Sequence, residues 1–96
     1  MPEEIKDIPL ENNQDDQAFE MNINGEIAFI GYEDDGDAYI LTHTEVPESL
    51  EGKGVGSALV LKTLNYIESE GRKIDARCPF VVSYIKRHPE WERLKR

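Results

Sequence analysis

A glycine-rich loop between a strand pattern and a helical pattern constrains this chain more than any other feature. The strand pattern ends at Thr42–Val46, Pro47 follows, and the loop GKGVGS at residues 52–57 precedes a helical run that ends near Gly71. Glycines at alternate positions let the backbone approach a ligand closely, and the free N–H groups of a first helical turn can bind an anion. The stretch therefore predicts a phosphate-binding loop.

Two common phosphate-binding motifs do not fit this loop. A Walker loop ends in Gly-Lys-Ser/Thr, whereas Lys53 lies between glycines here. A dinucleotide fingerprint needs a third glycine where this chain has Ser57, and it opens a longer βαβ series than the remaining chain can supply. A glycine-rich turn that binds no ligand stays open as the alternative.

Four short motifs follow one another along the chain. They are His43–Pro47, the glycine loop, Cys78–Val81 and His88–Glu90. Over about residues 18–90 this combination resembles the small, single-domain branch of the Gcn5-related N-acetyltransferases, whose loop reads Gln/Arg-x-x-Gly-x-Gly/Ala. Gly54 and Gly56 match that pattern, and Glu51 places an acid where the family usually has Gln or Arg.

Hydrophobic periodicity predicts an α+β fold. Alternating apolar residues and the hairpin signal Asn24-Gly25 indicate an antiparallel three-stranded meander. A β-α-β crossover and a C-terminal helix follow, giving the order β-β-β-α-β-α with a parallel last strand. The expected strands are 18–23, 26–32, 37–46 and 73–78, and the expected helices are about 55–70 and 80–87. Residues 18–96 should form a single acyl-CoA-binding domain, after an irregular N-terminal segment over 1–17 with room for one short edge strand.

The resemblance implies that acetyl-CoA or coenzyme A binds where two parallel strands separate. Its pantetheine arm would bond to strand backbone as an added strand does. The residues implied for pantetheine are Thr44, Glu45 and Val46. Those implied for the diphosphate are Gly52, Lys53, Gly54, Val55, Gly56 and Ser57.

Two side chains are candidates for catalysis. Cys78 precedes Pro79 at a predicted helix start, where a thiolate is stabilised, although a buried inert cysteine is the plain alternative. His43 shares a strand face with Glu45, and an imidazole there could accept a proton from an ammonium substrate or from Cys78; a structural histidine is its alternative. By resemblance, we expect an acetyl-CoA-dependent N-acetyltransferase acting on a primary amine, with a weak or inactive CoA-binding module as the alternative.

Composition limits the classes of partner that the chain is expected to bind. The net charge of −9 argues against nucleic acid and favours a cationic small-molecule or peptide amine, although simple solubility also explains it. No apolar run approaches the roughly 20 residues that span a bilayer, and no Cys/His cluster has metal-ligand spacing. One cysteine and an acidic, non-apolar N-terminus fit a cytoplasmic protein. We expect a monomer or a weak dimer.

Overall fold

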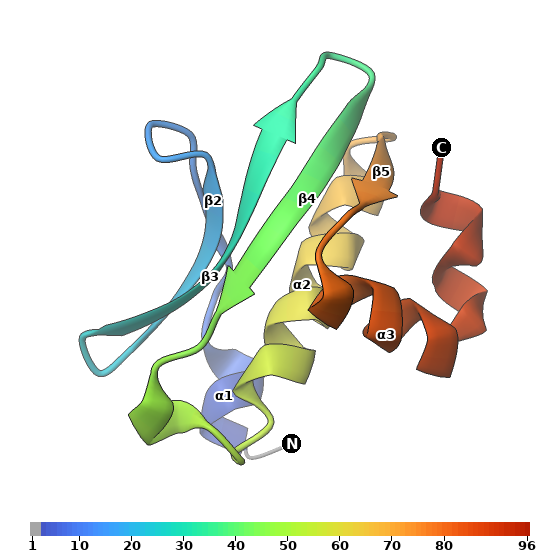
Figure 1. The fold of residues 1–96 in the computed structure, drawn as a ribbon. Coiled ribbons are helices and arrows are strands. Elements are labelled where there is room, and N and C mark those ends of the chain that lie inside the picture. The colour runs from blue at the N-terminus through green and yellow to red at the C-terminus, as the bar shows by residue number, and fades with distance from the viewer. Residues whose placement is uncertain (1–2) are drawn as a thin grey trace.

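A five-stranded sheet with all its longer helices on one face forms the protein (Figure 1). The structure is a computed structural model that describes residues 3–96. The strands are β1 (Glu11–Asn13), β2 (Ala18–Ile23), β3 (Glu26–Asp34), β4 (Ala38–Glu45) and β5 (Lys73–Ala76). The helices are α1 (Glu3–Asp7), α2 (Val55–Ser69) and α3 (Pro79–Arg87), with 3-10 turns η1 (Glu48–Leu50) and η2 (Pro89–Leu94).

The sheet order β1-β2-β3-β4-β5 confirms the predicted α+β class. Neighbouring strands are antiparallel except β4 and β5, which are parallel and joined through α2. The β2–β3 hairpin turns at Asn24 and Gly25, whose φ angles of 54° and 88° are the left-handed values that this dipeptide tolerates best.

The N-terminal segment contains a helix that was not predicted, together with the short edge strand for which the prediction left room. Residues 3–7 form α1, and residues 11–13 form the edge strand β1, paired with β2. Ile5 is buried in the common core, and the Lys62 ammonium of α2 donates a hydrogen bond to the Lys6 carbonyl. Contact with α2 thus orders a segment that has no apolar period of its own; Met1 and Pro2 lie outside the described residues.

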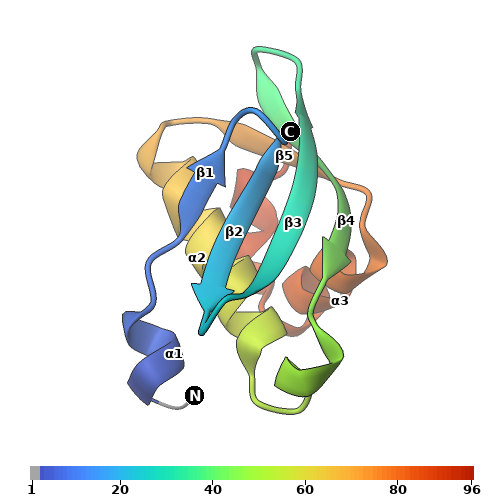
Figure 2. The ribbon, with the colours of Figure 1, turned by 90° about the vertical axis from the view of Figure 1, so that its left-hand side faces the viewer.

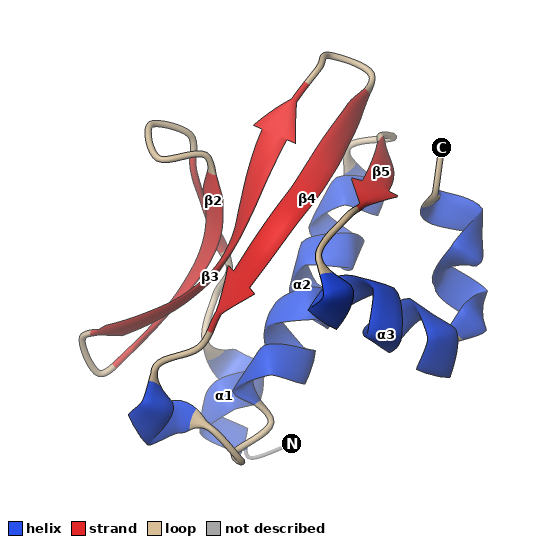
Figure 3. Ribbon diagram, in the orientation of Figure 1, coloured by secondary structure: helices blue, strands red, loops and turns tan. Residues whose placement is uncertain are grey.

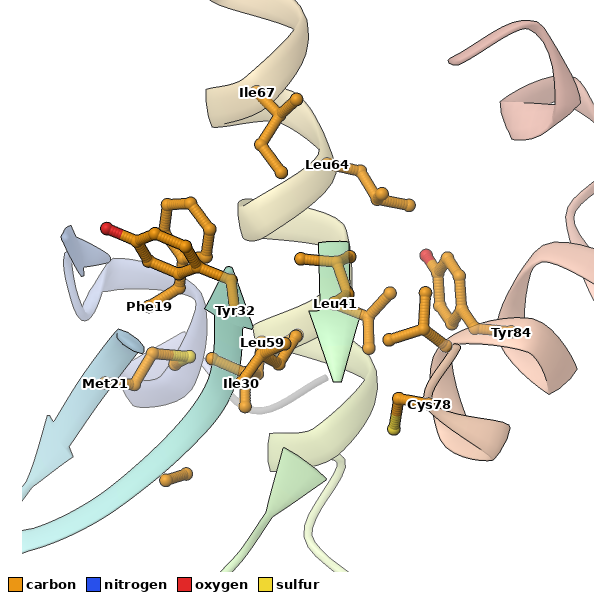
Figure 4. Close-up of a cluster of buried hydrophobic side chains, with 14 of the residues drawn as sticks. Phe19, Met21, Ile30, Tyr32, Leu41, Leu59, Leu64, Ile67, Cys78 and Tyr84 are labelled. Atoms are coloured by element: carbon orange, nitrogen blue, oxygen red, sulfur yellow. The ribbon is translucent and has the colours of Figure 1, made fainter. Parts of the chain in front are cut away.

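The core lies between the sheet and the helix layer, as Figures 3 and 4 show. Side chains that point inward from the strands meet the buried face of α2, which includes Leu59, Leu64 and Ile67. Trp91 and Leu94 of η2 are also buried. The opposite face of the sheet carries none of the described helices, and Figure 2 looks directly onto it. Within residues 3–96, no helix combines the length and the apolar character that crossing a bilayer requires.

Acidification should destabilise the fold through three aspartates. The Arg72 guanidinium lowers the pKa of Asp34, and Arg77 lowers that of Asp75. The Ala38 N–H, Arg96 and the Asp37 N–H lower the pKa of Asp35 to about 2 from its ordinary 3.8. A depressed folded-state pKa contributes stability above the unfolded pKa and loses it as protons bind the folded form.

We therefore expect the urea midpoint to fall as the pH drops from about 4 to about 2. The Asp35→Asn variant should lose part of this pH dependence, because it removes one of the titrating groups. A midpoint that is flat across this range would contradict the assignment of these ion pairs to the folded state.

Candidate functional site

The parallel strands β4 and β5 separate in the middle of β4. They pair from Ala38–Leu41 to Lys73–Ala76, and the Leu41 carbonyl then accepts the N–H groups of both Arg77 and Cys78 at 3.0 Å. Two successive donors on one carbonyl mark the point where the chain leaves the sheet. Beyond Leu41, β4 continues to Glu45 with β3 on one side and no described strand on the other, so its outer edge is open for pairing.

A β-bulge lies at the same point. Tyr32 pairs with Leu41 and Gly31 with His43, so Thr42 has no partner on β3. The Thr42 hydroxyl donates to the Gly31 carbonyl at 3.1 Å. The extra residue re-aims the side chains that follow it: Thr42 and His43 both lie on the helix-free face, while Thr44 points to the helix layer and contacts Cys78.

The imidazole of His43 has a defined place on the helix-free face. It lies over Gly31, where an added Cβ would come within 2.4 Å of the ring, and it meets the Phe29 ring edge-on at 5.5 Å. His43 Nδ1 is 3.1 Å from the Thr42 hydroxyl oxygen. When the single proton of Thr42 is donated to the Gly31 carbonyl, Nδ1 is the donor in this contact. In the neutral ring, Nε2 then carries the free lone pair and can accept a proton.

Cys78 occupies the helix start that the sequence predicts for it. It is the N-cap residue of α3, with Pro79 as the first helical residue, and its Sγ lies 3.1 Å from the Thr44 hydroxyl oxygen. Only 3% of the residue is exposed. The structure does not bring His43 to this thiol, because alternation along β4 places His43 and Thr44 on opposite faces of the sheet. A His43–Cys78 proton transfer is therefore not supported.

A pocket of about 360 Å³ lies below the point where the strands separate. Seven of the nine residues implied for the coenzyme line it: Thr44, Val46, Gly52, Gly54, Val55, Gly56 and Ser57. The side chains of Glu45 and Lys53 are exposed and do not line it. Glu51, at the first position of the loop motif, also lines the pocket, together with Leu50 and Phe80, to which no role was assigned from the sequence. The pocket joins the end of β4 to the start of α2, which are the two places that the resemblance implies for one ligand.

The glycine loop has a backbone suited to a diphosphate. Gly52 and Gly54 have φ angles of 78° and 80°, and nothing lies within 4 Å of the position that a Cβ would take at either residue. Gly54 is the N-cap of α2, and no side chain caps the helix there. The first turn contains no acidic residue, and Val55, Gly56 and Ser57, whose N–H groups have no partner within the helix, line the pocket at the positive end of the helix dipole. These residues fit a bound anion.

The absence of a side chain at Gly56 serves an aromatic contact. An added Cβ at this residue would lie 2.6 Å from Cζ of Phe80, a residue that is 40% exposed and lines the pocket. In this structure the group that packs closely against Gly56 is therefore the ring of Phe80, which covers part of the first turn of α2. No local pattern could have indicated this contact, because the two residues lie on different helices.

Gly56→Ala should therefore disturb the pocket through Phe80. We expect the variant to displace the ring and to lose about 1–3 kcal/mol of unfolding free energy, the usual cost of overpacking. The double variant Gly56→Ala/Phe80→Ala should recover most of that loss, because the clash is gone. Chemical denaturation of the parent, both single variants and the double variant measures the coupling; strictly additive effects would show that the contact is not the cause.

Comparisons with known proteins agree with this geometry. Residues 18–94 match the family model described as GCN5-related N-acetyl-transferase. Protein NATD1 of Mus musculus is 29% identical over 92 residues, covering 93% of this chain and 84% of the mouse protein. Protein NATD1 of Homo sapiens is 29% identical over 92 residues, with 93% and 81% covered, and that of Gallus gallus is 29% identical over 85 residues, with 85% and 77% covered. This chain belongs to the GCN5-related N-acetyltransferase family.

Proposed function

We propose that this protein transfers an acetyl group from acetyl-CoA to a primary amine. One observation carries the proposal: a single pocket joins the open end of β4 to the uncapped first turn of α2. A ligand with a peptide-like arm and a diphosphate needs both features, one for each part. The family match supports the same chemistry.

Two segments of the chain would bind different parts of the coenzyme. Backbone groups along the outer edge of Thr44–Val46 would pair with the amides of pantetheine as another strand does. The N–H groups of the first turn, from Val55 to Ser57, would hold the diphosphate. Glu51 lines the same pocket, and its carboxylate would repel the diphosphate. This chain should therefore bind the coenzyme less tightly than a Glu51→Gln variant does.

Transfer would take place at the edge of β4 beside the bulge. Thr44 faces the pocket and His43 faces the other side of the sheet, so ligands on the two sides can meet only along this edge. The amine nitrogen forms a bond to the acetyl carbon, the carbon–sulfur bond breaks, and the thiolate of coenzyme A leaves. The amine loses its proton to Nε2 of His43, the nitrogen that carries the lone pair when Nδ1 of the neutral ring donates to Thr42.

Calorimetry with the coenzyme, followed by acetylation assays on a panel of amines, tests the proposal. We expect binding of acetyl-CoA and of coenzyme A, and acetylation of at least one amine. The His43→Gln variant should keep the parent affinity for coenzyme A and lose about 10²–10⁴-fold in kcat, the range for general-base catalysis. Binding without turnover across the panel would make the protein a coenzyme-binding module, and absence of binding would overturn the proposal.

A covalent route, in which the acetyl group passes through the thiol of Cys78, can be tested with the same protein. The low exposure of Cys78 and its contact with Thr44 favour direct transfer instead. After incubation with acetyl-CoA, intact mass should show no acetyl adduct, and Cys78→Ala should keep its activity. An adduct that forms in the parent and is absent from Cys78→Ala would establish a route through the cysteine.

A further inference from the structure

A second cavity lies on the helix-free face of the sheet, on the far side of β4 from the coenzyme pocket. Its volume is about 460 Å³, which is within the usual range for small-molecule sites. Residues of β2, β3 and β4 line its floor, and residues of the loop between β1 and β2 line one wall. Figure 2 shows these elements on the side that faces the viewer. The N–H of Tyr32 donates to the Gln17 carbonyl at 2.9 Å, which fixes that wall against β3.

The charge of this cavity has one sign. Asp16, Glu20 and Glu33 line it, and no lysine or arginine does. Asn13 Nδ2 lies 3.1 Å from Asp16 Oδ2 and 3.2 Å from Glu20 Oε2, so one neutral amide holds these two carboxylates on the same side. Among the described residues, none of the three makes a salt bridge, whereas Asp34, Asp35 and Asp75 are all paired with arginines.

An aromatic ring and a base complete the cavity. Phe29 is half-buried in its floor, next to the imidazole of His43. Carboxylates and an aromatic face both attract an organic ammonium group. The distal Nε2 of His43 is the proton acceptor that a reacting amine needs, so the proposed base and the carboxylates belong to one cavity.

We propose that this cavity binds the acceptor, and that the acceptor is a small aliphatic diamine or polyamine. One amino group would reach His43 at the edge of β4, while a second, charged amino group would lie among Glu20, Glu33 and Asp16. The inference rests on the proposed function for the reaction itself. The binding of the cation is independent of the proposed function, because it depends only on residues of the helix-free face of the sheet.

The probes are 1,4-diaminobutane and n-butylamine, which share a four-carbon chain and differ by one ammonium group. Titrations followed by NMR, without coenzyme, should show at least tenfold tighter binding of the diamine to the parent protein. Glu20→Gln and Glu33→Gln should each weaken diamine binding about tenfold or more and raise its KM, with little change in kcat or in the affinity for coenzyme A. Asp15→Asn is the matched control, since Asp15 is an exposed neighbour of Asp16 that does not line the cavity.

The outcomes separate the two proposals. Equal binding of the two probes, or unchanged diamine affinity in both glutamine variants, would overturn this inference. Acetylation of a lysine peptide without diamine binding would overturn it as well, and would leave the proposed function standing. Diamine binding that is lost in Glu20→Gln, in a protein that fails to bind coenzyme A, would support this cavity and overturn the proposed function.

Discussion

Replacing Ser57 with glutamate should abolish most coenzyme A binding while leaving the fold intact. Ser57 is exposed, lines the pocket in which we propose that coenzyme A binds, and is the third residue of α2. A glutamate at this position favours a helix start, because a negative charge there complements the dipole. The same carboxylate repels a diphosphate held by that turn. At about 5 Å and an effective dielectric of about 20, each pair of unit charges repels by roughly 3 kcal/mol, which corresponds to at least a hundredfold loss of affinity.

The control is Ser57→Gln, which has the bulk of glutamate without the charge. We expect calorimetry to show a loss of less than about tenfold for this variant, and thermal unfolding to show that both variants fold. High salt should recover part of the affinity of Ser57→Glu, since screening weakens exposed charge interactions. If Ser57→Glu binds coenzyme A as tightly as Ser57→Gln, the diphosphate does not lie on this turn.

Leu41→Ala should be among the most destabilising substitutions in the chain. Leu41 is fully buried and points from β4 into the helix layer (Figure 4). Removing a buried leucine side chain costs about 2–5 kcal/mol, the larger values applying where the surroundings cannot close the cavity. In a domain of this size, each kcal/mol lowers Tm by about 4–8 °C, so a fall of roughly 10 °C or more is expected.

Leu61→Ala provides the comparison, because Leu61 is a half-buried leucine on α2 at the edge of the core. Alanine is the best helix former, which offsets part of the lost burial there. Denaturant unfolding of the two variants should therefore separate them by more than about 1 kcal/mol. Similar losses in both would mean that Leu41 does not lie at the centre of the packing.

The fold between Ala18 and Arg87 was predictable because its signals are local. Asn24-Gly25 requires two positive φ angles and predicts its hairpin, and the buried stripe of α2 repeats at helical spacing. Gly71, with a φ of 72°, follows the end of α2 as expected. The convergence of the loop and the strand end in one pocket followed from the β-α-β connection and was anticipated through the resemblance.

Features that depend on contacts between distant residues were not predictable. The extra residue Thr42 is invisible in an alternating pattern, yet it sets which face His43 occupies. The helix α1 is ordered by the burial of Ile5 against α2 rather than by its own period. Phe80 and Gly56 meet only because two helices pack on one face of the sheet. The acidic cavity likewise gathers side chains from three strands and a loop.

The open edge of β4 has a consequence for the life of the protein in a cell. A molecule that completes this edge binds the folded chain and not the unfolded one, so it raises the unfolding free energy by about 2.7 kcal/mol at a hundredfold excess over its Kd. Under our proposal that molecule is a central metabolite. The abundance of this protein would then rise and fall with the combined supply of acetyl-CoA and coenzyme A, through resistance to proteolysis alone and without any change in its synthesis.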